Sequence, residues 1–382
     1  MKCKLLDICS FRKGKIDIEN LNTKNYISTE NMLPNKCGIT DASSLPTVSL
    51  VQEYKKGDVL VSNIRPYFKK IWQAKYNGGC SNDVLVFVPK SNTDRNFLYY
   101  VLANDDFFTY SMATSKGTKM PRGDKTSIMQ YEVPMFDLNA QNKVASILKS
   151  LDEKIELNNA INNNLLEQVL TLYRNKFVDT VNDKRQICRA DEYFDISIGK
   201  TPPRKEPQWF STNPQDVTWV SISDMGTCGL YINSSSEQLT REAIDRHNVK
   251  IVPDNTVLLS FKLTVGRIAI TDGEITTNEA IAHFKTDKKK INEYLYCYLK
   301  CFNYQTMGST SSIATAVNSK IIKGMPFVVP TDEEIIEFHR LTAPMFAKIK
   351  ANQTETSNMT KLRDTLLPKL MSGELDISNI DL

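Results

Sequence analysis

The sequence lacks the features of membrane-spanning and disulfide-stabilised proteins. No apolar run approaches the roughly 18 residues that a membrane helix needs, and the first residues contain no long apolar segment of the secretory type. The eight cysteines form no CxxC pair. Cys297 and Cys301 lie four apart in an apolar segment, so we expect reduced thiols on one buried helix face. We therefore expect a soluble, cytoplasmic protein.

Motifs for catalysis and cofactor binding are also missing. There is no GxGxxG and no GxxxxGK[ST], and the Pro-Pro pair in Thr201–Arg204 lacks the flanks of an adenine methyltransferase. Pro253-Asp254 precedes Ser260-Phe261-Lys262, where Ser260 stands in place of the acid that a magnesium nuclease needs. None of the three histidines has a partner at metal-ligand or triad spacing. We predict no catalytic residue, no bound cofactor and no metal ligand in this chain.

The composition fits a packed protein of several domains. The chain has 382 residues, of which 41% are hydrophobic, and a formal net charge of +4. Residues 1–138 hold 19 basic against 14 acidic side chains, and residues 183–330 hold 18 against 16. Such small excesses suit a phosphate-binding surface and an ordinary solvated one about equally well.

The chain repeats itself, because residues 5–160 match residues 193–355 in the same order. The matching pairs are Asp58–Ser62 with Thr256–Ser260, Ser81–Leu85 with Thr277–Ile281, Phe97–Leu102 with Tyr294–Leu299, and Pro134 with Pro326. Short apolar segments predict strands at Asp58–Ser62, Val84–Val88, Val257–Phe261 and Arg267–Thr271. Helical spacing predicts helices at Asn96–Ala103 and Asn292–Phe302.

A long helix is predicted after each mixed domain. Between Asp137 and about Asp179, apolar residues recur every three or four positions, and Asn158 and Asn162 interrupt the stripe. A similar stripe runs from Phe338 to Leu370, where Pro368 should end or kink the helix. We predict an α+β fold in which two similar mixed α/β domains are joined by two long antiparallel coiled-coil helices with a near two-fold axis. Two unrelated helices, each on its own core, are the alternative.

Two segments on these helices resemble a known family. Val133-Pro134-Met135, Ala140–Leu148 and Leu151–Ile155 are similar to the central conserved region of type I restriction-modification specificity subunits. The tail Leu362–Leu375, with Leu-Pro-Lys-Leu-Met-Ser-Gly, resembles the distal conserved region of the same family. One departure is Asn139-Ala140-Gln141, where the family more often has an acidic residue before the Gln.

The resemblance implies a division of the chain and a role for each part. Target-recognition domains would occupy residues 1–138 and 183–330, the central conserved helix 139–182, and the distal conserved helix and tail 331–382. Each domain would read one half of a split, asymmetric sequence in double-stranded DNA. The helices would set the half-site spacing and dock two methylation subunits, which bind S-adenosylmethionine, and motor-nuclease restriction subunits would join. The chain itself would perform no chemistry.

Several basic segments are candidates for the DNA contact. In the first domain they lie in Ser62–Lys70, where basic and aromatic residues alternate, and in the Gly-containing loop Ser115–Lys125, with candidates Arg65, Tyr67, Lys69, Lys116, Thr118, Lys119, Arg122 and Lys125. In the second domain the corresponding candidates are Lys200, Arg204, Lys205, Lys262, Arg267, Ser311, Ser312 and Lys320. Arg65 and Arg267 suit bidentate contacts to guanine, although an ordinary solvated loop would also explain each of these residues.

Outward apolar positions on the first long helix are candidates for docking another protein. Ile161, Leu166 and Leu170 lie off the main stripe and could bury against a partner's helices. A second class of function stays open at this stage, namely a non-catalytic coiled-coil protein scaffold that does not bind DNA. A degenerate nuclease or methylase is the third class, and it would require turnover by the chain alone.

Overall fold

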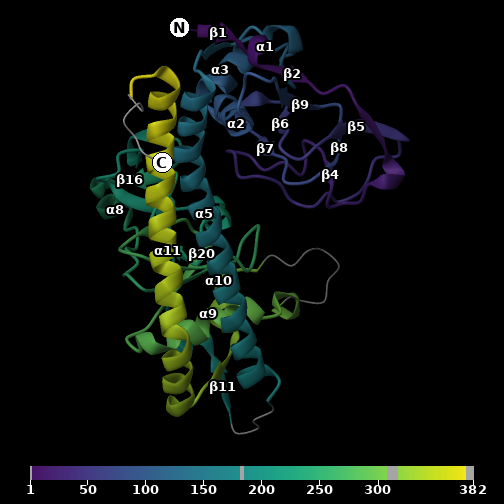
Figure 1. Cartoon of the computed structure of the whole chain (residues 1–382). Helices are drawn as coiled ribbons and strands as arrows, with labels where there is room; N and C mark the ends of the chain where they lie inside the picture. The colour runs from purple at the N-terminus through teal and green to yellow at the C-terminus, as the bar shows by residue number, and fades with distance from the viewer. Residues whose placement is uncertain (1, 181–184, 308–316, 376–382) are drawn as a thin grey trace. The chain divides into compact units, whose positions relative to one another are not determined.

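The structure is a computed structural model that describes residues 2–180, 185–307 and 317–375 (Figure 1). The chain divides into two compact units. The first unit comprises Met1–Ile155 and Asn358–Leu382, and the second comprises Glu156–Ser357. No helix among the described residues combines the length and the apolar character that crossing a lipid bilayer requires.

The first unit contains two four-stranded sheets and one strand pair. In the first sheet the strands lie in the order β2 (Cys9–Phe11), β9 (Val84–Pro89), β6 (Val59–Ser62) and β7 (Ile71–Gln73). The second sheet has the order β3 (Lys15–Asp17), β5 (Leu50–Tyr54), β8 (Gly78–Cys80) and β4 (Tyr26–Ile27), and the pair is β1 (Lys2–Lys4) with β10 (Glu132–Pro134). The helices and 3-10 turns are α1 (Leu5–Ile8), η1 (Ile18–Asn20), η2 (Pro66–Phe68), α2 (Arg95–Ala103), α3 (Asp105–Ala113) and α4 (Lys125–Ile128).

The second unit repeats this plan with a five-stranded sheet, a four-stranded sheet and one strand pair. The larger sheet has the order β12 (Asp195–Ile198), β20 (Ile281–Lys285), β17 (Val257–Ser260), β18 (Ile268–Thr271) and β15 (Tyr231–Ile232). The smaller sheet has the order β13 (Phe210–Ser211), β16 (Glu237–Leu239), β14 (Val217–Val220) and β19 (Thr276–Thr277), and the pair is β11 (Gln186–Arg189) with β21 (Pro326–Val329). The helices and turns are α6 (Ala190–Tyr193), η4 (Pro207–Trp209), α7 (Ile222–Thr227), α8 (Arg241–His247), η5 (Lys289–Ile291), α9 (Asn292–Cys301), η6 (Tyr304–Met307) and α10 (Ser319–Lys323).

The central strands are apolar throughout because both faces of their sheets are covered. In β6, Val59 and Val61 point into a core shared with the helices, while Leu60 points into a second core beneath the other sheet. The same alternation occurs in β17, where Val257 and Leu259 face one core and Leu258 faces another. All four predicted strands and both predicted short helices are thereby confirmed.

Two long helices contribute to both units. They are α5 (Leu138–Tyr173), which continues as a π-helical turn at Arg174–Val178, and α11 (Asp332–Ser372). Within the first unit Asp152 of α5 pairs with Arg363 of α11. Within the second unit Asn158 contacts Glu355 and Asn162 contacts Asn352, so the two helices run antiparallel there. The alternative of two unrelated helices is therefore wrong.

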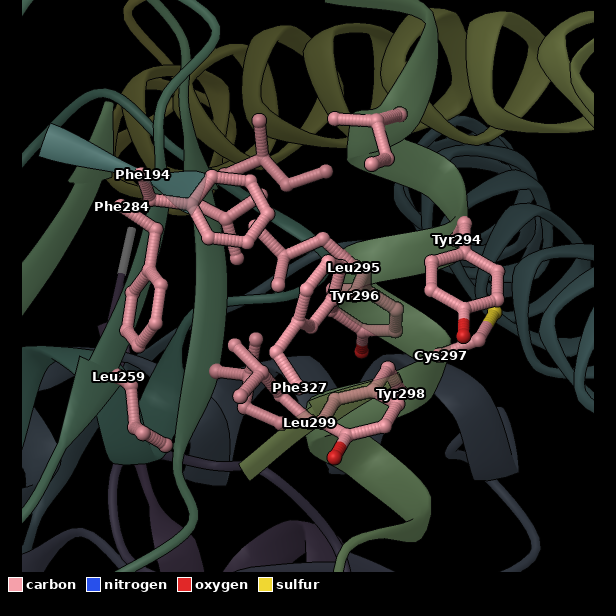
Figure 2. Close-up of a cluster of buried hydrophobic side chains, with 14 of the residues drawn as sticks. Phe194, Leu259, Phe284, Tyr294, Leu295, Tyr296, Cys297, Tyr298, Leu299 and Phe327 are labelled. Atoms are coloured by element: carbon pink, nitrogen blue, oxygen red, sulfur yellow. The ribbon is translucent and has the colours of Figure 1, made fainter. Parts of the chain in front are cut away.

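The main core of each unit combines residues from both long helices with the sheet and α2 or α9. In the first unit Val144 and Leu148 of α5 join Leu367 and Leu370 of α11. Figure 2 shows part of the second core, where Tyr294 and Tyr298 of α9 lie near Phe327, and Phe284 of β20 lies near Phe194. Tyr173 of α5 contacts both Tyr294 and Phe338 of α11.

Two expectations about single residues are wrong at least in part. Pro368 does not end α11, which continues to Ser372, because Leu367, Leu370 and Met371 are buried in the first core and tertiary packing outweighs the missing N–H; the alternative outcome, a kink, stays a prediction. Cys297 and Cys301 do not share a buried face, since Cys297 is buried while Cys301, at the C-terminal end of α9, is exposed. All eight cysteines are free thiols, as expected.

Candidate nucleic-acid interface

The two basic segments predicted for the first domain meet in the structure. The connection between β6 and β7 lies against the loop that precedes α4, where Ile64 and Arg122 form an antiparallel bridge. The N–H of Arg65 donates to the carbonyl of Pro121 at 2.8 Å, and the N–H of Gly123 donates to the carbonyl of Asn63 at 3.1 Å. Residues far apart in the sequence therefore form one continuous surface.

The loop before α4 presents its basic side chains to solvent. Lys116 and Arg122 exchange backbone hydrogen bonds of 2.9 Å, so the residues between them form a closed loop. The exposed candidates on this loop and directly after it are Lys116, Thr118, Lys119, Arg122 and Lys125. The ammonium of Lys116 pairs with Asp124 at 2.7 Å and holds the pKa of that carboxyl well below its usual range, while Arg122 pairs with Asp83 at 3.2 Å.

The tip between β6 and β7 has an unusual backbone. Arg65 and Lys69 adopt left-handed conformations with φ of 49° and 50°, on either side of the turn η2. Tyr67 is half exposed, and its ring lies 4.6 Å from that of Phe68. Lys69 pairs with Asp105 at 2.8 Å. Arg65 is half-buried and its Nε has no hydrogen-bond partner among the described residues.

In the second domain several candidates lie near the carboxylate of Glu279. Thr201 donates a hydrogen bond to Glu279, and the backbone N–H of Lys200 donates to Thr277 at 2.9 Å. Burial opposes ionisation of Glu279, but the bond from Thr201 and the charges of Lys262 and Arg204 lower its pKa. The exposed Arg204 pairs with Glu237 at 2.8 Å, and its guanidinium lies 4.1 Å from the ring of Phe210. Lys200 and Lys205 are exposed beside it.

The other candidates in the second domain differ in their accessibility. Arg267 is half-buried and donates from Nη1 to the carbonyl of Ile222 at 2.6 Å, so this guanidinium stabilises its own unit and its role as a guanine reader stays a prediction. Lys320 is exposed at the start of α10 and lines a surface pocket with Arg189 and Phe302. Ser311 and Ser312 lie outside the described residues.

Two residues that organise these surfaces were missed. Asp83 and Glu279 occupy matching positions in the repeat, within Ser81–Leu85 and Thr277–Ile281, and each bonds a candidate DNA-binding segment. The alignment of the two copies contained the signal, because an acidic residue follows Asn in both.

The predicted docking positions on α5 divide between half-exposed and buried. Ile161 and Leu166 are half-buried, and Leu166 packs partly against the core of the second unit. Leu170 is only 3% exposed, so the prediction that it faces outward is wrong. The reason is that α5 is buried on two sides in this stretch, by α11 and by the globular part of the unit, as the contacts of Tyr173 show.

The described residues contain no group of three or more His, Cys, Asp or Glu side chains that could hold a metal ion. The exposed basic side chains described above are the features of each domain that suggest a ligand. In the first unit they lie at the tip between β6 and β7 and on the loop before α4, and in the second unit at the tip between β17 and β18 and on the segment after β12. Phosphate and base edges are ligands that suit lysine, arginine and threonine side chains.

Comparison with known proteins gives these surfaces a context. The chain is 23% identical to the HindI specificity subunit of Haemophilus influenzae, over 92% of this chain and 94% of that protein. It is 24% identical to the MjaIX specificity subunit of Methanocaldococcus jannaschii, over 77% of this chain and 72% of that protein. The crystal structure of a type I restriction-modification S subunit from M. genitalium has a TM-score of 0.57 at 16% identity and covers 97% of this chain and 96% of that chain, so the fold is shared.

A family model settles the membership. The model described as "Type I restriction modification DNA specificity domain" matches residues 1–167 and again residues 182–351. These two matches coincide with the repeat found in the sequence, so the duplication is confirmed. The chain belongs to the family of type I restriction-modification DNA specificity proteins and carries two copies of its domain.

Proposed function

We propose that this specificity subunit reads a bipartite, asymmetric site in double-stranded DNA, with one half-site for each domain. The observation that carries the proposal is that basic side chains lie at the matching tips β6–β7 and β17–β18 and on a neighbouring loop, which is a different one in each copy. The side chains that would bear on the two half-sites differ, because Arg122 pairs with Asp83 in one copy and Arg204 stacks on Phe210 in the other. The two side chains also lie in different parts of the repeat, because Arg122 precedes α4 while Arg204 follows β12, and such differences suit two different half-sites.

The spacing of the half-sites would follow from the two long helices. Half-sites about one helical turn apart, roughly 34–36 Å, would present the same face of the duplex to both domains. The near two-fold relation between the copies stays a prediction. Within the second unit, the contact of the half-buried Asn162 with the buried Asn352 at 2.8 Å fixes the register of the helix pair.

We further propose that the chain itself catalyses no reaction and that other polypeptides supply the catalytic sites. Two methylation subunits would supply the S-adenosylmethionine site, and motor-nuclease restriction subunits would join them in the cytoplasm. Ile161 and Leu166 are the positions on α5 that could contribute to docking, since both keep part of their surface free. The absence of a phosphate-binding or methyltransferase motif in the sequence supports this division of labour.

The proposal is tested by selection of DNA. The chain is co-expressed with a methylation subunit from the same source, and the complex is used to select duplexes from a random pool at moderate salt. We expect enrichment of two short motifs at a fixed distance. A protein scaffold would instead show no salt-dependent affinity for any duplex, and a single uninterrupted motif would contradict reading by two domains.

A further inference from the structure

The tip between β17 and β18 carries a leucine that nothing in the described chain covers. Leu263 is 100% exposed, and its φ of 61° is a left-handed conformation that leucine rarely adopts. The N–H of Thr264 donates to the carbonyl of Lys262 at 2.6 Å and closes a three-residue turn around Leu263. An aliphatic side chain is thus held at the apex of a tight turn, where a glycine or asparagine would be less strained.

The base of this turn is firmly bonded. The hydroxyl of Ser260 donates to the carbonyl of Thr264 at 2.6 Å and accepts from the N–H of Arg267 at 3.0 Å. Phe261 is fully buried, and its N–H donates to the carbonyl of Ala280 at 2.9 Å. Leu263 is therefore presented by a fixed platform within its own unit.

The first unit has a matching tip. Ser62 corresponds to Ser260 in the repeat, and its hydroxyl also donates to a carbonyl within the tip, that of Ile64, at 3.1 Å. This tip presents Tyr67 and Phe68, which are 50% and 38% exposed. Both copies of the domain thus expose apolar side chains at the same place in the same hairpin, although the residues themselves differ.

A cation directly precedes Leu263 in the chain. Lys262 is exposed next to it, and Lys262 and Arg204 both act on the carboxylate of Glu279. One leucine side chain is too small for a stable protein interface, which buries about 1,200 Å² or more. Proteins that bend DNA commonly insert a single apolar side chain between base pairs while flanking cations hold the phosphates. The charge and the size of this feature therefore favour duplex DNA over a protein as its partner.

We propose that Leu263 is a wedge that inserts between two base pairs of the half-site read by the second domain, and that Tyr67 and Phe68 act at the same place in the first. This inference rests on the proposed reading of DNA and adds deformation of the duplex to it. Leu263 would determine specificity through the base step it opens, because steps differ in how readily they unstack.

The test uses the complex with the methylation subunit and the duplex selected by it, with 2-aminopurine placed at successive positions. The wild-type complex should raise the fluorescence at one step away from the methylated adenine. Leu263→Ala should remove that signal and weaken binding about tenfold, whereas Leu263→Met should keep both. Ile187→Ala is the matched control, because Ile187 is 65% exposed on β11 of the same unit, and it should behave as the wild type.

The other outcomes are distinguishable. If Leu263→Ala binds with the wild-type affinity and leaves the fluorescence unchanged, the wedge is refuted while the reading of DNA stands. If this variant instead loses the methylation subunit during purification, the tip docks a protein and the inference is wrong. If the wild-type complex binds no duplex at all, the proposed function fails, and the wedge fails with it.

Discussion

Several cations on the proposed DNA surface are already paired with carboxylates. Lys116 pairs with Asp124 and Arg122 with Asp83, while Arg204 pairs with Glu237. Exposed pairs of this kind contribute only about 0.2–1 kcal/mol, so exchanging the carboxylate for a phosphate costs little. The pairs set the position of each cation before DNA arrives, which favours specific contact over loose attraction.

Lys119 tests the electrostatic part of this account. It is exposed and has no ion-pair partner among the described residues, so its charge is free to neutralise a phosphate. Lys119→Ala should reduce the slope of log affinity against log salt concentration by about 0.9, and weaken binding to all sequences alike. Lys149→Ala, which removes an exposed lysine from α5, is the control. Equal slopes for Lys119→Ala and the wild type would remove Lys119 from the interface.

His283 gives a prediction about pH at the same scale. It is fully buried between Ser197 and Thr277, and burial, with a smaller contribution from Lys285, lowers its pKa to about 3. The imidazole is therefore protonated near pH 6.5 in the unfolded chain but stays neutral in the folded chain. Because protonation stabilises only the unfolded chain, this group lowers the free energy of unfolding as pH falls from 6.5 towards 3. The wild type should lose about 1.4 kcal/mol per pH unit more than His283→Gln between pH 6 and 4. Urea unfolding at several pH values measures this, and parallel curves would refute it.

At the scale of elements, local sequence patterns predicted the strands and helices well. They failed to predict the burial and contacts of side chains that depend on residues distant in the sequence. The strand at Val257–Ser260 was predictable because its residues are β-branched or apolar. The burial of Leu170 was not, because it depends on elements of the globular part that follow it in the sequence. Tertiary packing likewise decides that Arg267 donates a hydrogen bond to the carbonyl of Ile222 and that Leu263 is exposed. No local pattern in the sequence encodes either outcome.

One charged contact contributes to the pairing of α5 with α11 in the first unit, beside the apolar core that both helices share. Arg363 donates to Asp152 at 2.8 Å, and Asp152 also accepts the hydroxyl of Tyr100 at 2.7 Å. Although burial alone would lower the pKa of Arg363, its carboxylate partners raise it, so it stays charged. Arg363→Met should reduce the free energy of unfolding by about 1–3 kcal/mol, because Asp152 loses a partner in a half-buried place.

A matched variant separates this contact from surface charge in general. Lys149→Met breaks the exposed pair with Glu153 on the same helix and should change the free energy of unfolding by less than about 0.5 kcal/mol. Chemical unfolding followed by circular dichroism measures both. Equal effects for the two variants would contradict a structural role for Arg363.

At the scale of the whole molecule, each unit completes its core with segments from distant parts of the chain. The first unit combines Leu5 and Val59 with Leu367, Leu370 and Met371 near the end of α11. The repeat in the sequence predicted two domains with long helices, and the family matches confirm them. The periodic stripes did not predict that each helix would contribute to both cores, because periodicity shows which residues are buried and not what covers them.

Removing the end of α11 should therefore unfold the first unit. A chain that stops at Ser357 loses three buried side chains from that core, each worth about 2–5 kcal/mol, which together approach the whole stability of a domain. Hydrogen exchange should show rapid exchange in β6 and β9, with protection kept in β17 and β20. A chain that stops at Leu375 keeps these side chains and should protect both sets of strands. Protection of β6 in the shorter chain would contradict this view of the core.

The claim that two domains read two half-sites is tested most directly by sequencing the methylated bases in the genome of the source organism, with and without the gene for this chain. The account predicts one split motif, methylated on both strands, that disappears when the gene is deleted. A substitution confined to one domain, such as Arg122→Ala, should reduce the base preference in one half of the motif and leave the preference in the other half unchanged. A continuous motif, or a methylation pattern unchanged by the deletion, would contradict the account.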